Sequence, residues 1–196
     1  MGVTGNENEA SGLSGEAIRS YAEAVVAYPA YRTIRPTIEA GVDVDRLVYL
    51  LGGRIEHSDE HGAKLNVTDR RNFVIRVPRS SHPLYRRQLI AHEVGHYYLH
   101  YLLPKREGEW RACFTGKNEP TEIEANCFAR SLLVPSDEYL KASKDALSVL
   151  KSEGSHANPS QEEVICLAAT YLQVSPGIIS SLLSSFPEIT QVESGN

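Results

Sequence analysis

The chain has 196 residues, which suits one globular domain or one domain with a small appendage. Its 41% hydrophobic and 23% charged residues are ordinary for a folded protein, and its net charge of -5 disfavours a general nucleic-acid-binding protein, which is normally basic. It has three widely spaced cysteines, no leader pattern at its polar start, and no apolar run near the roughly 18 residues of a membrane span. These features predict a cytoplasmic protein without a membrane segment.

The first part of the chain predicts a disordered start followed by two helices. Residues 1–14 are rich in Gly, Ser, Asn and Glu, and are predicted to be disordered. An apolar stripe at helical spacing predicts a helix over 15–29. A shorter helix is predicted over about 43–51, where Asp43 is placed to cap its start.

Three short segments then predict strands. Residues 54–57 are one candidate, while 63–67 and 73–77 flank a turn-rich stretch and together predict a hairpin. Pro78 limits the end of the second hairpin strand to a sheet edge or an exit.

The rest of the chain predicts helices. Their expected ranges are about 84–102, 120–133, 136–151, 160–172 and 176–185. Together with the strands, these helices predict an α+β fold that is mostly helical, with one small antiparallel sheet beside the helical body.

His92-Glu93-Val94-Gly95-His96 is an HExxH motif inside a strongly apolar predicted helix. Residues four apart lie on the same face of a helix, so His92 and His96 can bind one Zn²⁺ ion. Glu93 lies next to His92, close to the same metal site, and can accept a proton from the attacking water without binding the metal. Burying these polar groups in an apolar helix is costly without a partner, and a metal ion is such a partner.

A catalytic zinc site of this kind needs a third ligand. In an unbroken helix with a rise of about 1.5 Å per residue, His100 lies about 12 Å from His92 along the axis, too far for both to bind one metal. We therefore expect His100 to lie at the edge of the site or to be a hydrogen-bonded histidine at the helix end. The helix predicted over 120–133 carries Glu122 and Glu124, which point in different directions, so only one can face the metal. Periodicity alone leaves that choice open.

Two segments of the chain resemble the ImmA/IrrE metallopeptidases, a gluzincin-like family. They are HEVGHYYLH at the end of one predicted helix and EIEANCFARSLLVP after the following loop. HExxH alone is shared by many families, but its combination with the second segment is much more specific. The resemblance runs from about Asp43 to Pro135. It implies a zincin-like metallopeptidase domain over 15–135, followed by a helical region over 136–190.

The resemblance also implies roles for single residues. The two motif histidines and Glu122 would bind one zinc ion per chain, with Glu93 as the general base. Asn126 would orient a ligand histidine, a role that outer hydrogen-bond partners have in many metal sites. The motif does not fix the residue that stabilises the transition state, for which Tyr98, Tyr85 and a nearby arginine are candidates.

Members of this family cleave or otherwise inactivate a helix-turn-helix repressor, and so switch on stress or mobile-element genes. The resemblance therefore implies a zinc metallo-endopeptidase whose partner is a protein substrate, namely a transcriptional repressor. For such a substrate, our hypothesis is that the strand over 73–77 pairs with an extended substrate segment. The alternative is a regulatory protein without proteolytic activity that binds a repressor or DNA.

Residues 161–183 resemble a helix-turn-helix, a motif whose second helix enters a DNA groove. The predicted helix over 176–185 has no Lys, Arg, Asn or Gln for contacts with phosphates or base edges. Glu162 and Glu163 on the first helix would repel phosphate. We therefore expect this helix pair to pack on the catalytic body or hold a partner, and direct DNA binding is disfavoured.

Overall fold

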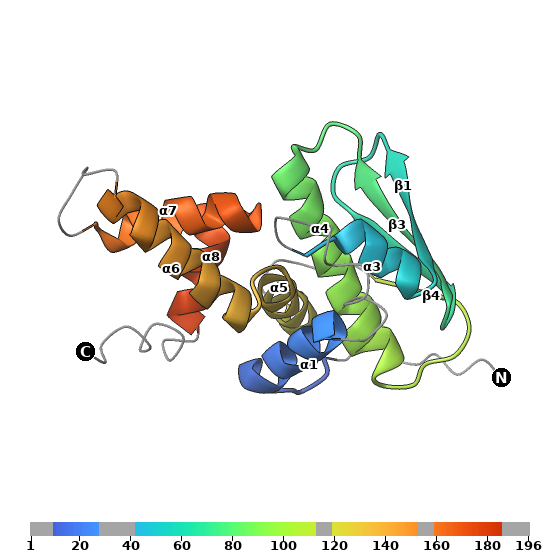
Figure 1. Ribbon diagram of the computed structural model, residues 1–196. Helices are drawn as coiled ribbons and strands as arrows, with labels where there is room; N and C mark the ends of the chain where they lie inside the picture. The colour runs from blue at the N-terminus through green and yellow to red at the C-terminus, as the bar shows by residue number, and fades with distance from the viewer. Residues whose placement is uncertain (1–9, 28–41, 113–118, 153–158, 186–196) are drawn as a thin grey trace.

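The computed structural model describes residues 10–27, 42–112, 119–152 and 159–185 (Figure 1). The helices are α1 (Gly15–Ala27), α3 (Val44–Leu50), α4 (Pro83–His96), the π-helix η2 (Tyr97–Leu102), α5 (Pro120–Leu133), α6 (Ser136–Ser152), α7 (Gln161–Leu172) and α8 (Pro176–Ser185). The strands are β1 (Gly53–Ser58), β2 (Lys64–Asp69), β3 (Asn72–Pro78) and β4 (Trp110–Arg111). Helices predominate beside one small sheet, so the described part of the chain has the predicted α+β architecture.

Local signals placed the helices correctly. Asp43 caps α3, because its carboxylate accepts the backbone N–H of Arg46 at 2.9 Å. The helix predicted over 15–29 is present as far as Ala27, and its last two residues lie outside the described residues. Of the start predicted to be disordered, residues 1–9 also lie outside the described residues, while residues 10–14 form neither helix nor strand.

The sheet is mixed, which corrects the prediction of an antiparallel sheet. The predicted hairpin is present, with β2 antiparallel to β3, but β3 also pairs with β1 in parallel. The strand order is β1-β3-β2-β4, so β3 lies between β1 and β2. Strands that follow each other in sequence usually lie side by side, and β1 and β2 depart from that tendency.

Because β3 is an inner strand, the hypothesis that residues 73–77 pair with a substrate segment is wrong. The backbone of β3 is paired on both sides, with β1 from Gly53↔Phe73 onwards and with β2. In the described part of the sheet, the outer strands are β1 and β4. Phe73, Ile75 and Val77 are buried, and both α3 and α4 pack against the sheet.

The helix predicted over 84–102 changes its winding after His96. The α-helix ends there, and η2 continues it with π-type bonds such as that from the Leu103 N–H to the Tyr98 carbonyl, at 2.9 Å. Short π segments inside α-helices are frequent at functional sites. Four of the six residues of η2 are buried, as in a continuation of the buried α-helix. The sequence pattern therefore does not distinguish a π-helix from an α-helix here.

Helices α6, α7 and α8 lie on the side of α5 away from the sheet (Figure 1). α6 packs on α7, α7 on α8, and α8 on α5. A hydrogen bond of 2.8 Å from Arg87 of α4 to Gln173, at the end of α7, links this group to the sheet side. None of the described helices is by itself long and apolar enough to cross a bilayer. The α7–α8 pair meets that test only when both are taken together, and it is bent by 115°.

Candidate metal centre

Helices α4 and α5 pack against each other in the middle of the molecule (Figure 1). Gly95 lies at a close approach between them: a Cβ atom at this position would be 3.0 Å from the carbonyl oxygen of Ala125 and 3.1 Å from its Cα. Such distances are shorter than about nine in ten contacts of Cβ atoms in proteins. The absence of a side chain at Gly95 therefore allows α4 and α5 to pack at this short distance. The approach brings Glu122 of α5 opposite the motif histidines of α4.

His92, His96 and Glu122 meet in one cluster. Glu122 Oε2 lies 3.2 Å from His92 Nε2, Glu122 Oε1 lies 3.3 Å from His96 Nε2, and the two Nε2 atoms are 3.0 Å apart. One ligand atom from each residue lies within 4.8 Å of the others, close enough to hold one metal ion. Two imidazole nitrogens and one carboxylate oxygen are a donor set that suits catalytic zinc.

Asn126 contacts the outer nitrogen of His92, with 3.1 Å between Asn126 Oδ1 and His92 Nδ1. A carboxamide oxygen can only accept a hydrogen bond, so this contact favours the neutral His92 tautomer with its proton on Nδ1. His92 Nε2 then presents a lone pair to the cluster. This contact supports the orienting role expected for Asn126.

Glu93 lies beside the cluster and is only 5% exposed. Its Oε2 is buried and has no hydrogen-bond partner among the described residues. Burial raises the pKa of Glu93 to about 7, with the charge of His92 opposing and the charge of Glu122 adding to the shift. A buried carboxylate with an unused acceptor atom suits a group that receives a proton.

The electrostatics of the cluster favour the metal-binding protonation states of Glu122 and His96, but not that of His92. Burial lowers the pKa of His92, but its hydrogen bond with Glu122 and the charges of Glu93 and Glu122 outweigh burial and raise that pKa, so a metal ion would displace a proton there. Burial raises the pKa of Glu122, but the hydrogen bonds that Nε2–H groups of His92 and His96 donate in the absence of a metal outweigh burial and lower that pKa to about 2. A bound metal would take the place of these protons. Burial lowers the pKa of His96 in spite of its hydrogen bond with Glu122. Metal ligation requires an ionised carboxylate and neutral imidazole, the forms that these shifts favour at Glu122 and His96.

Glu124 faces away from the cluster, and its placement answers the question that periodicity left open. Its Oε2 lies 2.9 Å from Nε2 of His100. His100 is buried in η2, where its Nδ1 lies 3.0 Å from Nδ1 of His96. His100 is therefore a hydrogen-bonded helix-end histidine, one of the two roles expected for it, and lies outside the set of three ligand atoms.

Tyr98 lies among other aromatic side chains. Its ring centroid is 5.7 Å from that of Phe128 and 5.9 Å from that of Tyr21, where η2 meets α5 and α1. This placement lends no support to a role for Tyr98 in stabilising a transition state. Tyr85, a second candidate, is exposed on the first turn of α4.

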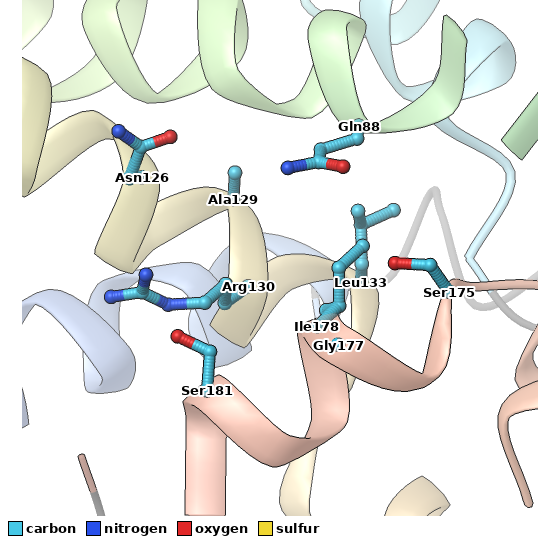
Figure 2. Close-up of a pocket in the computed structure, with 9 residues that line it drawn as sticks. All are labelled: Gln88, Asn126, Ala129, Arg130, Leu133, Ser175, Gly177, Ile178 and Ser181. Atoms are coloured by element: carbon cyan, nitrogen blue, oxygen red, sulfur yellow. The ribbon is translucent and has the colours of Figure 1, made fainter. Parts of the chain in front are cut away.

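A cavity of about 160 Å³ adjoins the cluster where α8 meets α4 and α5 (Figure 2). Its walls come from all three helices and the turn before α8: Gln88, Asn126, Ala129, Arg130, Leu133, Ser175, Gly177, Ile178 and Ser181. Asn126 belongs to both places, since its side chain also contacts His92. The second motif segment supplies Asn126, Ala129, Arg130 and Leu133 to this cavity, but the sequence did not predict it, because the packing of separate helices brings the other lining residues to them.

An HExxH helix facing a glutamate from the next helix is the arrangement of a zincin-type metallopeptidase. The model of the family described as Peptidase_M78, IrrE N-terminal-like domain, matches residues 54–183, well over half of the chain. The chain therefore belongs to this metallopeptidase family, which confirms the resemblance to ImmA/IrrE proteins. The match includes α6, α7 and most of α8. A search of curated proteins found no match to the chain.

Proposed function

We propose that this chain is a zinc-dependent endopeptidase that binds one zinc ion through His92, His96 and Glu122, with Glu93 as the general base. The observation that carries the proposal is the meeting of three ligand atoms within 4.8 Å, beside the buried Glu93. Family membership supports peptidase activity, and the donor set supports zinc.

Zinc bound at this site would supply Lewis-acid chemistry, polarising the scissile carbonyl and making a water molecule more acidic. Glu93 would take the proton of the attacking water at Oε2, the oxygen that has no other partner among the described residues. The same carboxyl would then donate this proton to the leaving amine. Asn126 would keep His92 oriented through its 3.1 Å contact during the reaction.

The proposed substrate is a helix-turn-helix transcriptional repressor in the cytoplasm, whose cleavage would derepress stress or mobile-element genes. The likeness of the two motif segments to ImmA/IrrE proteins supports this choice. The cavity beside Asn126 supports a peptide substrate, because it offers a recess of about 160 Å³ for one side chain. Gln88 and Arg130 in its walls would favour an acidic or amide side chain.

The test is cleavage of a repressor by purified protein loaded with zinc. Helix-turn-helix repressors from the same genome would be incubated with the wild type and with Glu93→Gln, and fragments identified by mass spectrometry. We expect one defined cut by the wild type. Glu93→Gln should lower the rate at least about 10²-fold and keep its zinc, because it removes only the proton acceptor. Cleavage by Glu93→Gln at the wild-type rate would contradict the proposed mechanism.

A regulatory protein that binds a repressor or DNA without cutting is the alternative function. The short break and the 115° bend between α7 and α8 support a helix-turn-helix-like arrangement. The lack of basic and amide side chains on α8 disfavours DNA contact. Under this alternative, Glu93→Gln would release the repressor from its operator as well as the wild type does, with no fragment formed.

A further inference from the structure

A chain of hydrogen bonds leads from His96 to the N-terminal segment. His96 Nδ1 lies 3.0 Å from His100 Nδ1, and His100 Nε2 lies 2.9 Å from Glu124 Oε2. The same carboxylate accepts the backbone N–H of Ser11 at 2.8 Å and that of Gly12 at 3.1 Å. Three segments that are far apart in sequence are joined in this way at one side of the candidate metal centre.

The carboxylate of Glu124 determines which atom donates and which accepts in each of these hydrogen bonds. Because a carboxylate only accepts hydrogen bonds, His100 donates from Nε2–H to Glu124, and a neutral His100 then has a lone pair on Nδ1. That lone pair accepts the Nδ1–H of His96. In a neutral His96, Nε2 then has no proton and presents its lone pair to the cluster, which is the tautomer that would bind a metal there.

The pair formed by His100 and Glu124 is buried, with exposed fractions of 2% and 8%. A buried carboxylate is strongly unfavourable unless donors surround it. Glu124 has three such donors, one from His100 and two from the backbone of Ser11 and Gly12. Gly12 has φ of +68°, a left-handed conformation that suits glycine and can turn consecutive N–H groups towards one anion.

The two histidines of the motif are held in different ways. His92 is held at its outer nitrogen by Asn126. The outer nitrogen of His96 is bound to a second histidine, which depends on Glu124 and so on a backbone segment 113 residues earlier in the chain. If that segment moved, the side chains of Glu124 and His100 would therefore shift as well and change the position of His96.

We propose that His100 and Glu124 are positioning residues for His96, and that the backbone of Ser11 and Gly12 holds Glu124 in place, so that the N-terminal segment contributes to metal affinity. The proposal rests on the proposed function, in that His96 is taken as a zinc ligand. Outer hydrogen-bond partners of ligand histidines typically account for 10–100-fold in metal affinity, which sets the size of the expected effect.

The test uses the full chain and measures the Kd for zinc by competition with a chromophoric chelator. Glu124→Gln and His100→Leu should each weaken zinc binding by about 10–100-fold. His100→Gln should recover part of that loss, because its amide offers one acceptor and one donor. Glu162→Gln, which removes an exposed carboxylate on α7, is the control and should bind zinc as the wild type does.

The N-terminal contact is tested with a matched pair of variants. Ser11→Pro removes the backbone N–H that Glu124 accepts, whereas Ser11→Ala keeps it and loses only the hydroxyl. We expect Ser11→Pro, and not Ser11→Ala, to raise the Kd for zinc. The visible absorption spectrum of the Co²⁺-loaded proteins is the second measurement. It should shift in Ser11→Pro and Glu124→Gln, since it reports the geometry of the ligands.

Thermal unfolding of the metal-free variants separates positioning from a general loss of structure. Weaker zinc binding with a shifted cobalt spectrum, in variants that remain folded without metal, supports the proposal. Wild-type affinity and an unchanged spectrum in Glu124→Gln, His100→Leu and Ser11→Pro overturn it while leaving the proposed function intact. Absence of zinc binding in the wild type overturns the proposed function, and the positioning role with it.

Discussion

Glu122 and Glu124 are two residues apart on α5, and both are buried, yet they have different partners. Glu122 faces the Nε2 atoms of His92 and His96, whereas Glu124 faces His100 and two backbone N–H groups. Since the residue type is the same, it is the direction of each side chain from the helix that determines its role.

Replacing Glu122 should therefore remove the metal. Glu122→Gln keeps the shape of the side chain but replaces a charged oxygen ligand with a neutral amide. We expect elemental analysis to find about one zinc per chain in the wild type and almost none in Glu122→Gln. At saturating zinc, Glu124→Gln should still reach about one zinc per chain, with weaker affinity. Equal loss of zinc in both variants would contradict the assignment of the third ligand.

The two described cysteines should differ in reactivity. Cys127 is buried, and burial raises the pKa of its thiol, whereas Cys166 is exposed. Because the thiolate is the nucleophile, a raised pKa leaves Cys127 with a smaller reactive fraction at any given pH. Iodoacetamide at about pH 8 should label Cys166 well before Cys127, as followed by peptide mass spectrometry. Equal labelling rates would show that the packing of α5 around Cys127 opens readily in solution.

At the level of the helices, the close approach of α4 and α5 depends on Gly95. Alanine favours a helix by about 1 kcal/mol over glycine, which would by itself stabilise α4. The added Cβ would, however, lie 3.0 Å from the carbonyl oxygen of Ala125, a backbone atom that cannot rotate away. We expect Gly95→Ala to lower the free energy of unfolding by about 1–3 kcal/mol and to weaken zinc binding. Urea unfolding and zinc titration would measure both effects.

Gly177 on α8 is the matched control, because a Cβ atom there would have no atom within 4 Å. Gly177→Ala should leave stability unchanged or raise it by up to about 1 kcal/mol. If Gly95→Ala proved as harmless as Gly177→Ala, the close approach of α4 and α5 would not be what brings Glu122 to the histidines.

The helices could be predicted because their signals are local, as with the Asp43 cap and the HExxH spacing. The sheet order could not, because the pairing of β1 with β3 depends on contacts across the chain, such as Gly53↔Phe73. The choice of Glu122 over Glu124 depends on how α5 is turned relative to α4. The sequence periodicity of α5 alone does not predict this orientation. The family resemblance was needed to name Glu122 before the structure showed where it lies.

In the molecule as a whole, α5 is the helix against which α1, α4 and α8 all pack. The candidate ligands join α4 to α5, so a bound metal would link two helices that a long segment separates in sequence. A ligand that binds only the folded chain stabilises it by mass action. Metal loading should therefore be visible in global unfolding as well as at the site.

Removing zinc should lower the thermal midpoint of the whole protein. At free zinc of 100 times its Kd, the expected stabilisation is about 2.7 kcal/mol. We expect the midpoint of wild type to fall after treatment with a chelator and to recover when zinc is added back, as measured by calorimetry. Glu122→Gln is the control and should show no zinc-dependent shift. A zinc-dependent shift of equal size in Glu122→Gln would place the stabilising metal elsewhere.

The contact of Ser11 and Gly12 with Glu124 has a consequence for the order of events at the ribosome. Ser11 and Gly12, which carry the two N–H donors, are translated first, and Glu124 is translated 113 residues after Ser11. At about 5–20 residues per second, roughly 6–23 s pass between the synthesis of Ser11 and that of Glu124. The surroundings of His96 therefore cannot be completed while the motif helix is being translated. Under the proposed positioning role, full metal affinity would be reached only after α5 has emerged from the exit tunnel.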